Sequence, residues 1–305
     1  MRATFNNPFK AKGRWYRGNL HAHSLNSDGS LTPEQLASLY RSCGYDFLSI
    51  TDHGKLTETE GLSTPRFLLI PGEEICVGTS EASTFFHIVA IDIGEELPVD
   101  DFDDHEDPQR VIELIRGLGG EAIVAHPYWS GLTFNDLIGL EGHRGLEVYN
   151  ANCELTVNRG LSNAHWDDLL SAGSRPLGFA VDDTHGVRRE NLPSDSCGGW
   201  INVKAEDLAV DHLMASIRGG LFYPSNGPEI KGIRIRDGVI SVSTSPARAI
   251  SFVSNAGLGE RHTGVTDLLT EAMYVPRGGE RYIRIEVSDE AGRTAWSNPI
   301  FITSS

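Results

Sequence analysis

Near its start the chain reads Asn19-Leu20-His21-Ala22-His23-Ser24, the first of several apolar runs that end in histidine or aspartate. Side chains alternate in direction along an extended strand, so His21 and His23 are expected to point to the same face. Asp28 follows five residues after His23. Two imidazoles and a carboxylate that project together are ligands typical of open, hydrolytic metal sites. This stretch therefore predicts a divalent metal site at the end of a strand.

The same pattern recurs along the first two-thirds of the chain. Apolar, strand-like runs end in Thr51-Asp52-His53, Pro71-Gly72-Glu73-Glu74, Ala125-His126-Pro127 and Asp182-Asp183-Thr184-His185, and His87 begins another apolar run. Helices are predicted between these runs, over 108–118, over 163–172 and from a capping residue at Thr32 to a terminator at Gly44. This alternation predicts an α/β fold with a parallel sheet, either open or closed into a barrel. In such barrels the chemistry gathers at the carboxyl ends of the strands, where these polar residues fall.

The sequence changes character after a Pro/Gly-rich joint at 224–228. Residues 233–242 alternate apolar and polar side chains around Asp237-Gly238, which is typical of a β-hairpin. Residues 282–287 alternate again before a turn at 289–292. We therefore predict two domains, a metal-binding α/β barrel over 1–227 and a small antiparallel β-sandwich over 228–305.

Composition restricts the class of partner. The 305 residues carry a formal net charge of -16, which argues against a basic groove for long nucleic acid. A small anionic substrate remains compatible with this charge, because bound cations invert the local field of an acidic site. The four cysteines show no paired spacing, the N-terminus has no apolar signal segment and no run approaches membrane-spanning length. We expect a reduced, cytoplasmic protein with no membrane partner.

The candidate ligands outnumber the roughly three protein ligands of one hydrolytic zinc. They are His21, His23, Asp28, His53, Glu74, His87, His126, Asp183 and His185. Alone, a strand histidine such as His87 is more often a hydrogen-bonded structural residue, and Thr51-Asp52-His53 could be a capping turn. Their joint occurrence at successive strand ends favours two or three divalent ions (Zn, Mn or Fe) that share a carboxylate. The remaining histidines, expected not to be ligands, are His105, His143, His165, His212 and His262.

Other catalytic classes lack their motifs in this chain. It has no Gly-x-Ser-x-Gly elbow, no Gly-rich phosphate loop with a following lysine and no dinucleotide-binding Gly-x-Gly-x-x-Gly unit. No cysteine stands in the neighbourhood expected of a nucleophile. Metal-assisted hydrolysis is the interpretation that uses the residues present.

Over residues 18 to about 226, these motifs and their order resemble the polymerase and histidinol phosphatase (PHP) family of metal-dependent phosphoesterases. The resemblance implies a distorted (β/α)7 barrel and, in most members, a three-metal site. It implies one metal held by His21, His23, Glu74 and Asp183, a second held by Asp28, His53 and His185, and a third held by Glu74, His87 and His126. Glu74 is expected to be the bridging ligand rather than Glu73, because the family motif reads Pro-Gly-x-Glu.

Our leading functional hypothesis is hydrolysis of a small phosphomonoester, such as a nucleotide or sugar phosphate, by a hydroxide that bridges two metals. It gives Asp28, His53 and His185 a catalytic role. We expect Asp52 to orient a ligand histidine. The expected substrate-binding residues are Arg159, Arg188 and Arg189.

Two alternatives use the same cluster. The segment 15–21 and the C-terminal domain look like a branch of the family that includes aryl carbamate hydrolases. Hydrolysis of a carboxylic or carbamate ester is therefore the first alternative. A metal-bound binding module without catalytic activity is the second.

Overall fold

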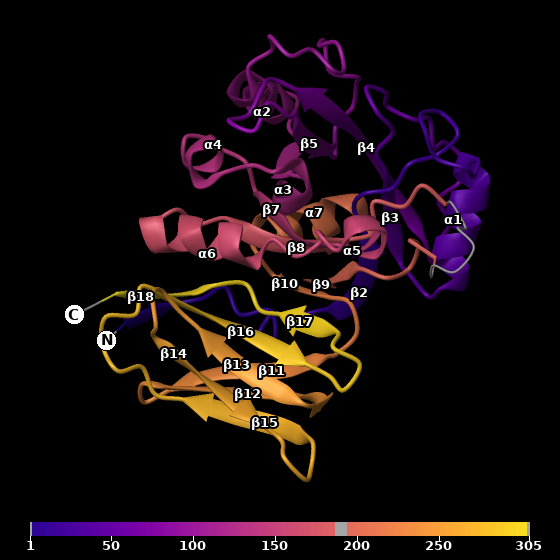
Figure 1. Cartoon of the computed structure of the whole chain (residues 1–305). Coiled ribbons are helices and arrows are strands. Elements are labelled where there is room, and N and C mark those ends of the chain that lie inside the picture. Colours follow the sequence, from indigo (N-terminus) through magenta and orange to yellow (C-terminus); the bar gives the residue numbers. More distant parts are fainter. Residues whose placement is uncertain (1, 187–193, 304–305) are drawn as a thin grey trace.

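The computed structural model of the chain describes residues 2–186 and 194–303 (Figure 1). It has a mixed α/β architecture, with a large sheet and few helices. The helices gather around one half of the molecule, and the second half consists of strands (Figure 1). The seven-unit barrel and the appended sandwich stay predictions.

Consecutive strands of the large sheet follow the order of the chain. They are β2 (Arg14–Asn19), β3 (Phe47–Ile50), β4 (Leu68–Val77), β5 (Phe86–Ile91), β6 (Glu121–Val124), β7 (Gly145–Asn150) and β8 (Leu177–Val181). The pairs β2–β3, β3–β4, β6–β7 and β7–β8 are parallel, whereas β5 is antiparallel to both β4 and β6. The prediction of a parallel sheet is therefore wrong around β5. The described residues 78–85 contain no helix, and so short a connection reverses the chain instead of returning it for a parallel pairing.

The helices are α1 (Pro33–Ser42), α2 (Pro108–Gly117), α3 (Pro127–Ser130), α4 (Phe134–Ile138), α5 (Ala151–Val157), α6 (Asn163–Ala172) and α7 (Val210–Arg218). The predicted helices at 108–118 and 163–172 are confirmed as α2 and α6. At the start of α1, the Thr32 hydroxyl accepts the Gln35 N–H, and the Gln35 side chain accepts the Thr32 N–H. This capping box explains why the helix begins where the sequence predicts.

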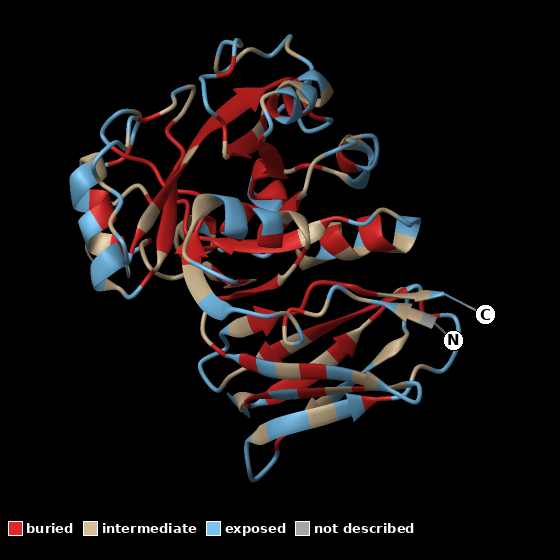
Figure 2. Ribbon diagram, turned by 180° about the vertical axis from the view of Figure 1, so that it is seen from behind, coloured by how far each residue is buried: buried red, intermediate tan, exposed pale blue. Residues whose placement is uncertain are grey.

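The strands that lead to the predicted metal ligands are anchored by apolar side chains. Every residue of β3 and β7 is buried, and the buried strands run through the middle of this half of the molecule (Figure 2). Phe47, Val89, Ile123 and Phe179 come from four different strands and belong to one core. Because such cores are close-packed, the polar residues at the strand ends are held in defined positions.

The C-terminal strands form two antiparallel layers. One layer contains β11 (Ile230–Arg236), β12 (Val239–Ala247) and β15 (Leu269–Tyr274). The other contains β13 (Ala249–Val253), β14 (Gly259–Thr263), β16 (Tyr282–Ser288), β17 (Thr294–Trp296), β18 (Ile300–Thr303) and the N-terminal β1 (Arg2–Thr4). The predicted hairpin around Asp237-Gly238 is confirmed as β11–β12. Val242 and Ile285 illustrate the apolar core that both layers share.

Hydrogen-bonded strands connect the two halves of the molecule. The strand β9 (Trp200–Ala205) is antiparallel to β2, β10 (Phe222–Ser225) pairs with β9, and β17 pairs with β10. The buried Arg284 of β16 adds an ion pair, with Nη2 2.5 Å from Oδ2 of Asp167 in α6. The predicted domain boundary at residue 227 falls between β10 and β11. It stays a prediction, because β10, before the boundary, pairs with β17, after it, in one continuous sheet.

A disulfide joins Cys43, at the end of α1, to Cys197, in the segment before β9. It corrects the expectation that the cysteines are all reduced. The pair is separated by 154 residues, so no local spacing signals it, and the packing of α1 brings the two Cα atoms to 6.4 Å. Cys76 and Cys153 are free and buried. Among the described residues, none of the helices combines the length and apolarity needed to cross a membrane.

Candidate metal centre

Glu74 on β4 is a buried carboxylate on which several histidines converge. Its Oε2 lies 3.3 Å from Nε2 of His21, 3.3 Å from Nε2 of His23 and 3.4 Å from Nδ1 of His53, and its Oε1 lies 3.1 Å from Nδ1 of His87 and 3.4 Å from Nε2 of His126. Glu73 points to the other face of β4, where it accepts the Leu97 N–H at 2.7 Å. Strand alternation thus places Glu74, and not Glu73, among the imidazoles.

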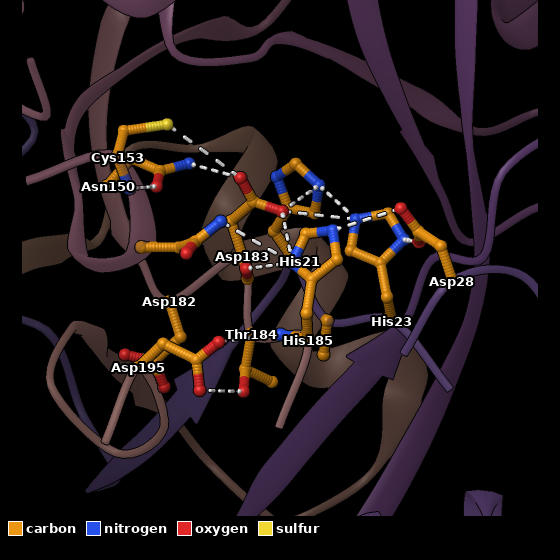
Figure 3. Close-up of polar contacts among 12 residues, drawn as sticks. His21, His23, Asp28, Asn150, Cys153, Asp182, Asp183, Thr184, His185 and Asp195 are labelled. Carbon is orange, nitrogen blue, oxygen red and sulfur yellow. Dashed lines mark hydrogen bonds and ion pairs between the residues drawn. The ribbon is translucent and has the colours of Figure 1, made fainter. Parts of the chain in front are cut away.

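Asp183 is the second carboxylate at the centre of the cluster (Figure 3). Its Oδ1 lies 3.2 Å from Nε2 of His21 and 3.1 Å from Nε2 of His23, and its Oδ2 lies 3.8 Å from Nε2 of His126. Asp183 and His126 both have positive φ angles, 53° and 26°. Such strained backbone conformations in non-glycine residues concentrate at functional sites.

Asp28, His53 and His185 form a group at the exposed side of the cluster. Oδ2 of Asp28 lies 3.3 Å from Nε2 of His185 and 3.9 Å from Nε2 of His53. The His23 ring stacks on both imidazoles, with centroid distances of 4.6 Å to His53 and 4.5 Å to His185. The hydrogen bond from His185 lowers the pKa of Asp28 to about 2, so this carboxylate is ionised at neutral pH.

All nine predicted ligands therefore lie in one cluster, and each of the three groups implied by the PHP resemblance has its members together. Among the described residues, none of the histidines expected not to be ligands belongs to a group of converging donors. His143 Nδ1 and His165 Nε2 instead contact the carbonyl oxygens of Gly145 and Leu132, at 3.1 and 3.0 Å. That the nine clustered residues bind metal stays a prediction.

Glu147 on β7 is a functional candidate that the sequence reasoning missed. Its Oε1 lies 2.7 Å from Nδ1 of His21, and its Oε2 accepts the His126 N–H at 2.9 Å and the Asn150 side-chain N–H at 2.9 Å. When Nδ1 of His21 donates to Glu147, Nε2 is left as the lone-pair nitrogen that faces Glu74 and Asp183. A charged residue within the apolar strand 145–150 was the signal that could have found it.

Asp52 does not orient a histidine, which corrects the prediction for this residue. Its carboxylate accepts the Ser24 N–H at 2.6 Å, the Ser24 hydroxyl at 2.7 Å and the Ser27 hydroxyl at 2.8 Å, together with the Thr57 hydroxyl. These donors lie in or against the loop 24–28 after His23. Asp52 therefore shapes the loop that presents Asp28.

Asp182, next to Asp183, is bound from the opposite side by the segment before β9. Its carboxylate accepts the N–H groups of Cys197 at 2.8 Å, Gly198 at 2.8 Å and Gly199 at 2.6 Å. It also accepts the Tyr40 hydroxyl of α1 at 2.6 Å. Hence the disulfide-bonded segment positions the backbone that carries Asp183.

Asp195 of the same segment supports His185. Its Oδ1 accepts the Thr184 hydroxyl at 2.9 Å, and its Oδ2 accepts the His185 N–H at 2.9 Å (Figure 3). The segment 195–199 thus holds the loop 182–185 at two points.

A cavity of about 690 Å³ opens onto the cluster. Its apolar walls include Phe85, Phe102 and Trp129, and none of the described residues that line it is a lysine or arginine. Arg159 is exposed outside this lining, with its guanidinium 4.6 Å from the centroid of the Tyr128 ring, so the structure does not bring it to the cavity. The other two predicted substrate-binding residues, Arg188 and Arg189, lie outside the described residues.

The donor set fits divalent cations. Burial lowers the pKa of His21, but Asp183, Glu74 and Glu147 outweigh burial and raise it well above its ordinary value. The same balance, with hydrogen bonds to Asp183 and Glu74, raises the pKa of His23 to about 9. Protons therefore balance the buried carboxylates of the metal-free cluster at neutral pH. Yet Nε2 of His21 lies only 3.1 Å from Nε2 of His23, an arrangement that a shared cation satisfies better than two protons do.

Comparisons with known proteins identify the fold. No family model matches the chain. A two-domain protein from Bacteroides vulgatus containing a predicted PHP-like metal-dependent phosphoesterase superposes with a TM-score of 0.52 at 15% identity, over 90% of this chain and 91% of that one. The chain shares the fold of this two-domain protein. This likeness confirms the sequence-based recognition at the level of the fold.

Three other proteins are similar to this chain over a smaller part of its length. An uncharacterized protein from Methanocaldococcus jannaschii is 28% identical over 120 residues, 39% of this chain, and the match spans just under two thirds, 66%, of that protein. An amidohydrolase from Chromobacterium violaceum superposes with a TM-score of 0.41 at 17% identity, over 58% of this chain and 92% of that one. A lesion-specific endonuclease from Pyrococcus furiosus gives 0.38 at 12% identity, over 68% and 56%.

Proposed function

We propose that the chain is a PHP-family metal-dependent hydrolase that cleaves a small phosphomonoester of the nucleotide or sugar phosphate type. The observation that carries the proposal is the convergence of nine imidazole and carboxylate side chains where a cavity opens. The PHP-like fold supports it, since the Bacteroides vulgatus protein with this fold contains a predicted metal-dependent phosphoesterase. Divalent ions bound at such a site lower the pKa of coordinated water towards about 7 and neutralise charge on substrate oxygens.

The clustered side chains would hold the metal ions and orient one another. Glu74 and Asp183 would hold ions jointly with the histidines around them, and Glu147 keeps His21 in the tautomer whose Nε2 faces those carboxylates. Asp28 and His185 would hold an ion at the cavity side, because both line the cavity. Burial lowers the pKa of His53, so its ring is neutral at pH 7 and able to act as a ligand.

A second candidate is hydrolysis of a carboxylic or carbamate ester at the same cluster. The walls of the cavity favour it, because Phe85, Phe102 and Trp129 suit an apolar or aromatic substrate group. The described lining also lacks the arginine or lysine that commonly grips a phosphate. The metal chemistry is compatible with phosphate and with carbamate ester hydrolysis, since a bound cation can polarise a carbonyl or a phosphoryl oxygen.

The decisive experiment compares substrates that share a leaving group and differ in the group that is transferred. The metal content of the purified protein is measured first, and kcat/KM is then determined for 4-nitrophenyl phosphate and a 4-nitrophenyl carbamate. Faster phosphate hydrolysis, extended to nucleotides and sugar phosphates, supports the phosphoesterase, and faster carbamate hydrolysis supports the second candidate. Bound metal without turnover of either compound, or of a broad ester panel, would contradict both.

A further inference from the structure

Cys76 is a buried thiol that faces the metal cluster from β4. It follows Glu74 by two residues, so strand alternation puts both side chains on the same face. Its Sγ lies 3.2 Å from Nδ1 of His87 and 3.5 Å from Nδ1 of His53. The sulfur is therefore in contact with two imidazole nitrogens that also contact Glu74.

These distances match the edges of a metal coordination shell. A tetrahedral ion with bonds of about 2.3 Å to sulfur and about 2.0–2.1 Å to nitrogen separates the two donors by roughly 3.5 Å. The Sγ–Nδ1 distance of 3.2 Å to His87, and the 3.1 Å from that Nδ1 to Oε1 of Glu74, are close to this size. The three donor atoms of Glu74, Cys76 and His87 all lie within 4.8 Å of one another.

The backbone around Cys76 is anchored from a neighbouring loop. Oδ1 of Asp101 accepts the Cys76 N–H at 2.6 Å, and Oδ2 of Asp101 lies 3.7 Å from Nδ1 of His53. One carboxylate thus fixes both the strand that carries the thiol and a neighbouring imidazole. This support limits how far the sulfur can turn away from the cluster.

We propose that Cys76 is a thiolate ligand of the metal ion that Glu74 and His87 hold. The inference rests on the proposed metal cluster and adds a sulfur donor to the nine side chains assigned above. Coordination to a cation deprotonates a thiol outright, and the proton is released to solvent. Because thiolate is a soft ligand, this position selects zinc over manganese or magnesium.

Cys153 offers a matched control within the same chain. It is also buried, and it also lies beside the cluster, with Sγ 3.9 Å from Oδ2 of Asp183 (Figure 3). It belongs to none of the groups of converging donors found among the described residues. A serine substitution at Cys153 therefore removes a nearby sulfur without removing a proposed ligand.

The test uses cobalt(II), whose bond to a thiolate produces a charge-transfer absorption band in the near ultraviolet. We expect this band in the cobalt-loaded wild type and in Cys153→Ser, and we expect it to disappear in Cys76→Ser. The Kd for zinc should rise about 10-fold or more in Cys76→Ser, whereas the Kd for manganese should change far less. Circular dichroism shows whether each variant is folded, and Cys76→Ala replaces Cys76→Ser if the serine variant does not fold.

Zinc K-edge absorption of the wild type gives a second measurement that needs no variant, with sulfur scattering expected at about 2.3 Å. A band that persists in folded Cys76→Ser, or zinc with only nitrogen and oxygen neighbours, would overturn the assignment of Cys76 and leave the proposed hydrolase intact. Failure of the wild type to bind cobalt or zinc at all would instead overturn the metal cluster, and with it both proposals.

Discussion

Oε1 of Glu147 lies 2.7 Å from Nδ1 of His21, and both side chains are buried. The contact joins β7 to the segment just after β2, so it connects elements that are far apart in the sequence. Through it, a carboxylate that is not a proposed ligand determines which nitrogen of His21 faces Glu74 and Asp183.

Replacing Glu147 with glutamine should weaken metal binding by about 10- to 100-fold, because the neutral amide holds the His21 ring less firmly. The measurement is a competition titration with a chromophoric zinc chelator. Glu113→Gln makes the same chemical change at an exposed position of α2 and should leave the affinity unchanged. Equal affinities for wild type and Glu147→Gln would show that Glu147 has no role in orienting His21.

Replacing His126 with alanine should lower kcat/KM by at least about 100-fold, since a proposed ligand contacting Glu74 and approaching Asp183 is lost. Metal content by mass spectrometry should fall in the same variant. His212→Ala, at a half-exposed position away from the cluster, is the control. A fully active His126→Ala would refute the cluster assignment.

Metal binding should release protons at neutral pH. Asp183 and Glu74 hold the pKa of His23 near 9 in the metal-free protein, so the ion must displace a proton that is bound at pH 7. Affinity should therefore rise with pH and level off near pH 9, once the histidine is already neutral. Calorimetric titration in two buffers with different ionisation enthalpies checks this, and identical heats in both would contradict it.

Removing the disulfide with Cys43→Ser and Cys197→Ser should lower the free energy of unfolding by about 2–4 kcal/mol. Metal retention should also decrease, because Cys197 lies in the segment that binds Asp182 beside Asp183. Urea unfolding and dialysis against a chelator measure the two effects. A thiol reductant should destabilise the wild type and not the double variant; equal effects on both would place the reductant's action elsewhere.

Arg284→Ala should lower the free energy of unfolding by about 3 kcal/mol, because it removes the buried cation that pairs with the Asp167 carboxylate. Arg236→Ala removes an arginine whose ion pair with Asp237 is almost fully exposed, and it should change stability by less than about 0.5 kcal/mol. Denaturant unfolding compares the two variants. Similar losses would mean that the Arg284–Asp167 pair does not brace the two halves of the molecule.

Local sequence signals predicted a large part of this structure. Thr32 and Gln35 mark the start of α1 because a capping box needs only residues three apart, and Asp237-Gly238 marks a hairpin for a similar reason. Alternation along β4 is also a local rule, and it predicts that only one of Glu73 and Glu74 faces the cluster; the PHP resemblance selected Glu74. The nine clustered side chains were found because each is a histidine or carboxylate within or shortly after an apolar, strand-like run.

Long-range features escaped the sequence reasoning. Glu147 and His21 are in contact although 126 residues separate them in the sequence, and 154 residues separate Cys43 from Cys197. No rule based on sequence spacing predicts either pair. The antiparallel placement of β5 was missed because an apolar run has the same pattern in both strand directions. Arg159 was assigned by residue type alone, and its stacking on Tyr128 depends on how α5 ends.

The pairing of β1 with β18 has a consequence for the timing of folding. Arg2 pairs with Thr303, so β1 cannot pair with β18 until the roughly 300 residues between them have been synthesised. Contacts between residues this far apart form slowly, because the loop between them must be closed first. The strands that present Glu74 and Asp183 lie within that loop and are free to assemble earlier. We therefore expect the metal centre to fold before β1 pairs with β18.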